Sequence, residues 1–509
     1  MKRAAKGAAP FAPVLLAIVA VLMRAHQLGV QQGRDYDEGV YWESLRAMHG
    51  GATLYRDIYY SQPPMFLLTA YPIFEAFGRT IFAARLSCAM FSLLGIAGAY
   101  LTGRALAGPR GGSVAMLLAI SSAAYLRMSQ TLQAEASAIG LSFLCVGSML
   151  AARRLPIERR SIVCAFAGIA FALALGCKFL VVASIVPICA CVVVPAPGGS
   201  LRVREPAILA LAFALGFGAG CAVAIVPFAH DLPAMWNQVV FLHEAASRAS
   251  GNVTGANLLS ILGALWSPLA LAAFLGTLVA VANGDRMGIV LGAWFGATAG
   301  VLLVLAPMFP HHLVVLVPPL IALCVLSLAR RPTPRWEVPR LRNLAFFAIA
   351  LCVVLGAIAC NVYFVRDARV ALGPENVALR RAVFDLDAFT KPGDRVVGDG
   401  QFVAALADRD PPPWLVDTSF ARIDSGQLTF SDAATATADP DVTAVLSYRK
   451  RFIALPGYRG WLRGRFTLRA DFGDDRELWV RAVRTANSDF LRARPGRIVA
   501  AIAAGRRNP

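Results

Sequence analysis

Three carboxylates lie within four positions near the start of the chain: Asp35, Asp37 and Glu38, in the stretch RDYDEGVYW. They follow closely on an apolar run, FAPVLLAIVAVLM. A carboxylate within hydrogen-bond reach of a hydroxyl can act as a general base, and it can also stabilise positive charge on a reacting carbon. Because ionised groups near a membrane are costly, we expect these acids to face a cavity or a partner.

Further charged and polar side chains recur at the ends of later apolar runs or in the connections between them. They are Arg85, Glu135, Lys178, His243, Arg248, His311 and His312. Arg suits bidentate contact with phosphate or carboxylate, and Lys acts more as a point charge. The set therefore combines acids that could activate a hydroxyl with cations that could hold an anionic group.

The elements that must position these residues are apolar. The chain has 509 residues, of which 57% are hydrophobic and 16% charged, with a mean hydropathy of +0.59. A soluble domain needs more charged surface, so the composition predicts an integral membrane protein. A spanning helix needs about 20 apolar residues. About eleven stretches are candidates, at 10–29, 81–104, 112–127, 131–152, 161–178, 179–195, 206–229, 256–282, 287–308, 312–329 and 343–363.

Lys and Arg gather in short loops on alternate sides of these stretches. The loops hold Lys2, Arg3 and Lys6; Arg104 and Arg110; Arg153, Arg154, Arg159 and Arg160; Arg202 and Arg204; Arg286; and Arg330, Arg331, Arg335, Arg340 and Arg342. Cytoplasmic loops carry such an excess, so we expect these loops and the N-terminus to be cytoplasmic. The basic N-terminus and the apolar run that follows it are interpreted as an uncleaved signal-anchor. This distribution accounts for the net charge of +18 without a nucleic-acid partner.

The remaining connections would then lie outside a plasma (inner) membrane that the chain crosses many times. They are 30–80, the turns at 127–131 and 178–179, 230–255, 308–312 and the chain after about 363. The candidate residues fall in these connections or beside them, so one polar cavity at the outer face would collect them. Segment 30–80 is predicted to hold interfacial helices, because Tyr41, Leu45 and Met48 recur at helical spacing.

The charge also divides the chain into domains. Residues 366–509 hold 41 of the 80 charged residues, so a transmembrane domain is expected over 1–365. An extracytoplasmic α/β domain is expected over 366–485, with strands at 394–400, 413–419 and 442–448 and a helix at 401–409. A basic tail, 486–509, follows it. All ten cysteines precede residue 366 and none forms a CxxC pair, so we expect buried free thiols.

The order of these features resembles the polytopic glycosyltransferases with the GT-C fold, closest to the relatives of protein O-mannosyltransferases and lipid A aminoarabinose transferase. The resemblance covers about residues 10–330. It rests on the Asp-Glu pair, an aromatic segment ending in QPP, an ARL in the next span, an acid opening a later span, a Lys at a helix end, and a Trp…His…Arg loop. It implies a mostly α, polytopic helical bundle that moves a hexose or pentose from a polyprenyl-phosphate donor to a lipid, glycan or protein acceptor in the cell envelope.

The resemblance also implies roles for individual residues in an inverting transfer. Asp37 stands where the family has its base, with Glu38 beside it. Phosphate contacts would come from Lys178, Arg248 and His311 or His312, and further substrate contacts from Asp35, Arg85 and Glu135. His243 matches a histidine that could help to hold a divalent metal. In YYSQPP, however, Ser61 and Gln62 replace a Glu-Lys pair of the aminoarabinose transferase, so a metal ligand and a phosphate contact are missing there.

Simpler roles stay open at this stage. Asp35 could pair with Arg34, Glu135 could stabilise a helix start, and Lys178 could reach out to the interface. The histidines could be ordinary loop or interfacial residues. For the whole chain, the alternative is a polytopic membrane transporter or lipid-sugar flippase, although such proteins often show repeated halves and this chain does not. A sugar-lipid polymerase or ligase is a third candidate. Residue spacing does not encode the sugar, the acceptor, the carrier length or the oligomeric state.

Overall fold

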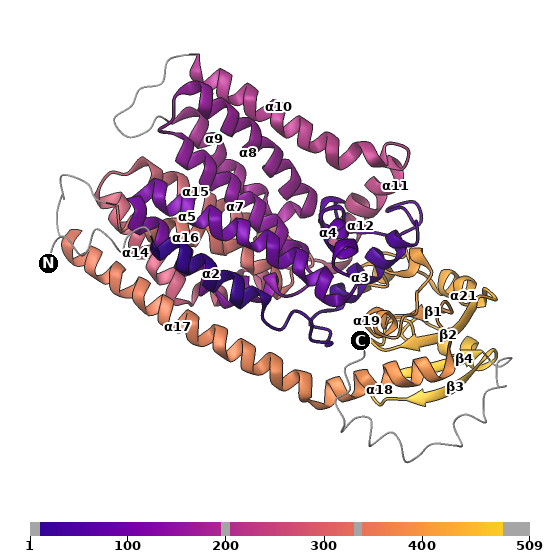
Figure 1. The fold of residues 1–509 in the computed structure, drawn as a ribbon. Helices are drawn as coiled ribbons and strands as arrows, with labels where there is room; N and C mark the ends of the chain where they lie inside the picture. The colour runs from indigo at the N-terminus through magenta and orange to yellow at the C-terminus, as the bar shows by residue number, and fades with distance from the viewer. Residues whose placement is uncertain (1–10, 195–203, 330–337, 482–509) are drawn as a thin grey trace. The chain divides into compact units, whose positions relative to one another are not determined.

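The computed structural model describes residues 11–194, 204–329 and 338–481 (Figure 1). The chain divides into two compact units, Met1–Val377 and Ala378–Pro509. The predicted basic tail at 486–509 lies outside the described residues, as do Lys2, Arg3, Lys6, Arg202, Arg330, Arg331 and Arg335 of the predicted cytoplasmic loops.

The first unit is helical. Its long apolar helices are α5 (Ile81–Ile120), α7 (Ala134–Ala152), α8 (Ile157–Cys177), α10 (Glu205–Ile225), α15 (Arg286–Val304) and α17 (Val338–Leu372). Shorter α-helices are α2 (Phe11–Ala25), α3 (Tyr36–His49), α4 (Met65–Ala76), α6 (Ala123–Ser129), α9 (Ile185–Val193), α11 (Leu232–Trp236), α12 (Leu242–Ser250), α13 (Thr254–Leu265), α14 (Pro268–Ala282) and α16 (Val317–Leu326). Tighter or wider turns form η1 (Phe179–Ser184), η2 (Val226–Phe228), η3 (Asn237–Phe241) and η4 (Pro310–Leu316).

The predicted membrane stretches all fall on helices, but fewer than eleven helices are long enough to cross a membrane. Within the described ranges, six helices are long and apolar enough to cross a membrane, or seven if α13 and α14 count as one broken span. The stretch 256–282, predicted as one span, is divided between these two helices, which meet at a bend of 83°. Pro268 has no N–H to continue α13, and Ser267 instead caps α14 by accepting from the Ala270 N–H at 3.3 Å.

Segment 30–80 contains the two short helices that its pattern predicts. Helix α3 buries Tyr41 and Leu45, and Met48 is half-buried. Helix α4 begins directly after the two prolines of QPP and accommodates Pro72 inside it. Gln238, on η3, accepts a hydrogen bond from the Tyr60 N–H and donates one to the Tyr55 carbonyl, each at 2.8 Å. The segment between α3 and α4 is therefore fixed to the bundle.

Small residues let the central helices approach closely. Helices α5 and α7 pack along each other, as do α8 and α10 (Figure 1). A Cβ added to Gly140 of α7 would collide with the backbone carbonyl of Phe91 on α5. Backbone contact at this point requires glycine, since no side chain there can move aside. The contact sets the position of the start of α7, which carries one of the candidate residues.

The second unit contains a four-stranded sheet in the order β1-β2-β4-β3. Strand β1 (Arg395–Gly398) is parallel to β2 (Val442–Ser447); β4 (Glu477–Arg481) pairs antiparallel with both β2 and β3 (Phe466–Asp471). The helices are α18 (Pro374–Phe389), α19 (Gln401–Leu406), α20 (Phe420–Asp424), α21 (Phe430–Ala438) and α22 (Tyr458–Arg463). Helix α18 begins just before the boundary between the units.

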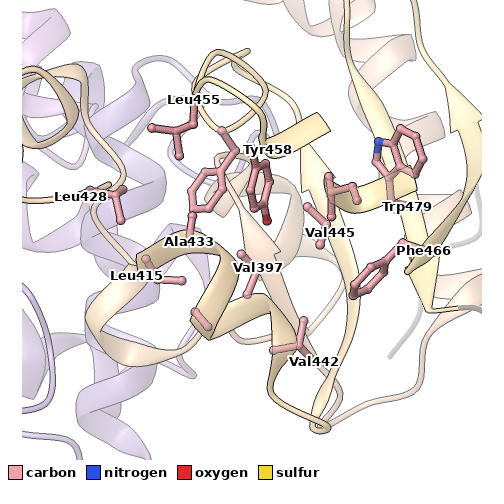
Figure 2. Close-up of a cluster of buried hydrophobic side chains, with 13 residues drawn as sticks. Val397, Leu415, Leu428, Ala433, Val442, Val445, Leu455, Tyr458, Phe466 and Trp479 are labelled. Atoms are coloured by element: carbon pink, nitrogen blue, oxygen red, sulfur yellow. The ribbon is translucent and has the colours of Figure 1, made fainter. Parts of the chain in front are cut away.

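The sheet and its helices share one hydrophobic core. Val397, Val445 and Trp479 from three strands pack with Tyr458 and Leu415 (Figure 2). The strands predicted at 394–400 and 442–448 and the helix at 401–409 are present in shortened form. The strand predicted at 413–419 is wrong: three prolines precede Trp414, and the chain forms the short 3₁₀ turn η5 (Pro413–Leu415) instead.

The cysteines agree with their predicted role. All ten are free thiols, and most are buried. A small apolar side chain without a disulfide partner is the simplest account of them.

Candidate functional site

The core of the site is an ion pair between Glu38 of α3 and Arg85 of α5. The Arg85 Nε lies 2.7 Å from Glu38 Oε1, and Nη2 lies 2.9 Å from Oε2. Both side chains are 0% exposed. The carboxylate also accepts the N–H groups of Arg34 and Leu132, each at 3.0 Å. Burial alone would raise the pKa of Glu38, but the Arg85 and Arg34 charges outweigh it, so the pKa lies below its usual value.

Arg85 also fixes the chain that leads from α2 to the acids. Its Nη1 donates to the carbonyls of Leu28 and Val30 at 3.0 and 2.7 Å, and its Nη2 donates to the Gln32 carbonyl at 2.7 Å. One guanidinium thus satisfies three backbone carbonyls and one carboxylate. This use of all its donors makes Arg85 a positioning residue for the acid-rich loop.

A second buried pair joins this loop to α17. Arg34 Nη2 lies 2.7 Å from Asp367 Oδ2, and Gln32 Nε2 donates to Asp367 Oδ1 at 2.5 Å. Arg34 also donates to the carbonyls of Gln27 and Gln130. Arg34 therefore pairs with Asp367 and not with Asp35, the partner that the sequence had left open.

The two remaining acids occupy the start of α3. Asp35 is the N-cap, and its Oδ1 accepts the Asp37 N–H at 3.2 Å. Asp37 lies in the first helical turn and is half-buried. The partial positive charge of a helix start is complementary to side chains of this type. The other oxygen of Asp35, Oδ2, lies 3.9 Å from Nδ1 of His311.

Glu135 and Lys178 form the third buried ion pair. Glu135 lies in the first turn of α7, and Lys178 follows α8 in an extended conformation that turns its chain into η1. The Lys178 Nζ lies 2.5 Å from Glu135 Oε1. The other oxygen, Oε2, accepts no hydrogen bond from any residue that the structure describes. Lys178 therefore points inward, and not outward to an interface.

The two histidines of PHHL lie against the same carboxylate. Nε2 of His311 and Nε2 of His312 lie 3.6 and 3.7 Å from Glu135 Oε1. The turn η4 holds them there, because the Phe309 N–H donates to His312 Nδ1 at 3.2 Å. Burial lowers the pKa of His311 below its usual value, and the attraction of Glu135 offsets this only in part.

Glu135, His311 and His312 have the residue types and spacing of a metal site, with ligand atoms within 4.8 Å of one another. Their donors do not fit one. A neutral imidazole whose Nδ1 accepts a hydrogen bond carries its proton on Nε2, so His312 presents an N–H and no lone pair to the cluster. Lys178 already places a positive charge on Glu135 Oε1. A divalent ion would need His312 to change tautomer and Lys178 to withdraw.

The predicted residues of the later outer loop are placed differently. Arg248 of α12 is exposed and forms an ion pair with Glu244 one turn away. His243 Nδ1 bonds the Val239 carbonyl at 2.9 Å, and this histidine is not part of the group formed by Glu135, His311 and His312. The roles predicted for His243 in metal binding and for Arg248 in phosphate binding remain predictions.

Three site residues were not selected from the sequence. Arg34 is adjacent to the acids, and Asp367 lies just after the last apolar stretch, which is a weak signal. Tyr60, in YYSQPP, is buried near Asp37 and Glu135, and its hydroxyl has no hydrogen-bond partner among the described residues. Burial raises the pKa of Tyr60 well above its usual value, so it is a neutral phenol that can donate a hydrogen bond.

The fold has counterparts among solved structures. The crystal structure of ArnT from Cupriavidus metallidurans bound to undecaprenyl phosphate matches with a TM-score of 0.66, at 16% identity, over 92% of this chain and 97% of that one. The chain has the GT-C fold. The apo structure of the same ArnT gives a TM-score of 0.61 at 15% identity over the same shares.

The sequence was also compared with protein-family models and with curated protein sequences. Residues 61–222 of this GT-C chain match the family model described as dolichyl-phosphate-mannose-protein mannosyltransferase. Among curated protein sequences, none matches. The resemblance drawn from the Asp-Glu, QPP and ARL motifs is thus confirmed for the fold.

Proposed function

We propose that this protein is an integral membrane glycosyltransferase, a hexosyl- or pentosyltransferase that moves a sugar from a polyprenyl-phosphate donor to an acceptor hydroxyl or phosphate. The observation that carries the proposal is the cluster of Asp35, Glu135, Lys178 and the two PHHL histidines. Asp35 of this cluster caps the helix whose first turn holds Asp37. The similar ArnT was crystallised with undecaprenyl phosphate, which supports a polyprenyl-phosphate partner here.

The charges suit the two ends of the reaction. An acceptor oxygen attacks the anomeric carbon as it loses its proton to a carboxylate, and the bond from that carbon to the donor phosphate breaks. The proton stays on the carboxylate, and the electron pair leaves with the phosphate. Asp37 is our choice of base, because it is half-buried at a helix start while Glu38 beside it is fully engaged with Arg85.

Phosphate release needs a nearby cation, and Lys178 is the buried one in this cluster. An ammonium has three donors, so contact with Glu135 leaves it able to contact phosphate oxygens as well. The inversion of configuration that a single displacement gives is part of this proposal. So is the placement of the site at the outer membrane face, which rests on the positive-inside pattern of the loops.

The test is transfer by purified protein. Radiolabelled polyprenyl-phosphate sugars are incubated with the protein and with Asp37→Asn, and labelled product is separated from donor. We expect transfer by the wild type and a loss of about 10²–10⁴-fold in the variant, the usual contribution of a general base. Transfer that survives unchanged in Asp37→Asn removes this residue from the mechanism. Glu375→Gln, an exposed carboxylate at the start of α18, is the matched control.

A transporter or lipid-sugar flippase is the alternative from another class. Such proteins place their charged sites near the membrane midplane, between repeated halves. In this chain the charged residues of the Glu135 cluster lie at the start of α7, just after α8 and in the turn η4. Proteoliposomes decide between the two: movement of sugar-lipid with every glycosidic bond intact would contradict the glycosyltransferase proposal.

A further inference from the structure

The source of positive charge at Glu135 distinguishes two kinds of site. A carboxylate with two histidines nearby commonly holds a divalent metal. Here the same oxygen, Oε1, lies 2.5 Å from Lys178 Nζ and 3.6 Å from the nearer histidine nitrogen. The ammonium is therefore the closest positive group to the carboxylate.

The histidines are arranged to match a fixed ammonium. His312 presents Nε2–H to Glu135, because its Nδ1 accepts from the Phe309 N–H. Proton-bearing nitrogens can assist an anion but cannot ligate a metal. Glu135 is 1% exposed, so its charge needs a permanent partner that does not depend on a dissolved ion.

Several buried atoms of the cluster have no hydrogen-bond partner in the described part of the chain. Glu135 Oε2 and His311 Nε2 are both buried and form no hydrogen bond there. Buried polar atoms of this kind are normally satisfied, so they point to a group supplied by a ligand or water. A hydroxyl can donate to Oε2 and bond His311 Nε2 as well. Asp35 is the most exposed side chain of the cluster, at 26%.

We propose that the Lys178 ammonium is the resident cation of this cluster in place of a divalent metal, and that Glu135 Oε2 and His311 Nε2 bind a hydroxyl of the sugar substrate. Lys178 keeps Glu135 ionised and fixes one of its oxygens, which leaves the other free to orient the hydroxyl. The hydroxyl assignment rests on the proposed function. The assignment of the cation does not.

Metal binding is tested first, without any activity measurement. Chelator-treated full-length protein in detergent is titrated with Co²⁺ and followed by visible absorption. We expect wild type and Glu135→Gln to give the same spectra, with no ligand-field bands from this site. Bands in the wild type that disappear in both Glu135→Gln and His311→Ala would overturn the proposal, whatever the enzyme does with sugar-lipids.

Chemical rescue tests the role of the ammonium. In the transfer assay, Lys178→Ala should lose about 10²–10³-fold in rate, as expected for removal of one preorganised charge. Ethylammonium should restore part of this rate, and divalent metals should not. Lys391→Ala, which removes an exposed lysine of the second unit, should be unaffected with or without amine. Rescue by a divalent metal instead of the amine would contradict the proposal.

A variant that retains the charge and a substrate that lacks the hydroxyl complete the test. Lys178→Arg retains the charge, so it should keep more activity than Lys178→Ala, and it serves if the alanine variant does not fold. Equal activity of the two would show that charge at this position is unimportant. If wild-type protein transfers no sugar at all, the proposed function fails, while the cobalt result still decides which cation the cluster uses. The hydroxyl contact is checked with deoxy-sugar donors, which lack the hydroxyl. Such a donor should have a higher KM than the normal donor for the wild type, and the two donors should have similar KM values for Glu135→Gln.

Discussion

Arg34 and Asp367 are 333 positions apart in the chain, yet their side chains form a buried ion pair with Nη2 and Oδ2 2.7 Å apart. Nε of the same arginine donates to Oδ1 at 3.1 Å, so the contact is bidentate. The pair joins α17 to the loop that carries Asp35 and Asp37. The backbone N–H of Arg34 also donates to the Glu38 carboxylate, which is paired with Arg85, so the two ion pairs are linked. The start of α3 is thus held from two distant helices.

This arrangement predicts strong coupling between the two residues. Arg34→Met and Asp367→Asn should each destabilise the protein by about 3 kcal/mol, because each leaves an uncompensated buried group. The double variant should lose less than the sum of the two. Thermal unfolding in detergent, followed with a thiol-reactive dye, measures this, since the buried cysteines react only after unfolding. Additive losses would show that the contact contributes no coupling energy.

Glu38 makes stability depend on pH in a defined direction. Its pKa in the folded protein lies below its usual value near 4.5, so the Glu38 charge contributes stability that is fully present above that pH. This contribution is lost as the pH falls through the lower, folded-state pKa. Glu38→Gln should therefore be less stable than wild type at pH 7, and the difference should shrink below about pH 4.5.

The measurement is thermal unfolding from pH 7 to pH 3 for both proteins. Glu375→Gln is the matched control, because Glu375 is an exposed acid at the start of α18. This control should follow the wild-type curve throughout. A difference between wild type and Glu38→Gln that grows towards acid pH would contradict the assigned role of the Glu38–Arg85 pair.

Close packing of α5 and α7 gives a prediction about glycine. Gly140→Ala places a Cβ against the Phe91 carbonyl and should cost about 1–3 kcal/mol through overpacking. Gly292→Ala on α15 places its Cβ in open space, so it should be neutral or raise stability by up to about 1 kcal/mol through helix propensity. The two melting temperatures should therefore move in different directions. Equal losses would mean that α5 and α7 are not in backbone contact.

Much of the site could be predicted because charge burial is costly in a membrane protein. An acid or lysine at the end of an apolar stretch has few tolerable environments, so Glu135 and Lys178 could be expected to meet groups of opposite sign. The short helices of segment 30–80 followed from helical spacing and from proline positions. Such signals are local, and they survive without knowledge of the tertiary fold.

The partners could not be predicted, because they depend on how the helices pack. Nothing near Asp367 indicates that Arg34 is its partner, and Asp35 offered a nearer alternative. The bend at Trp266–Ser267 was not predicted because the stretches on both sides of it are apolar. Pro268 can end a helix or only bend it, and which of these occurs depends on the packing around it. The strand expected at 413–419 failed because hydrophobic content was weighed above the three prolines that precede it.

The tautomer of His312 yields the last prediction, in which two isosteres separate its two nitrogens. Asparagine places an acceptor near the position of Nδ1, so His312→Asn can still accept the Phe309 N–H and should keep the η4 turn and nearly wild-type stability. It lacks the N–H that faces Glu135 and should transfer sugar more slowly, by about 10-fold, the effect of losing one polar contact to a charged group. His312→Gln places a donor near Nε2 but loses the Phe309 contact, so it should keep more activity per folded molecule and melt at a lower temperature. Melting and transfer rates measured on the same preparations decide the matter. If the asparagine variant is the less stable and the more active of the two, the assigned tautomer is reversed, and His312 becomes available as a metal ligand.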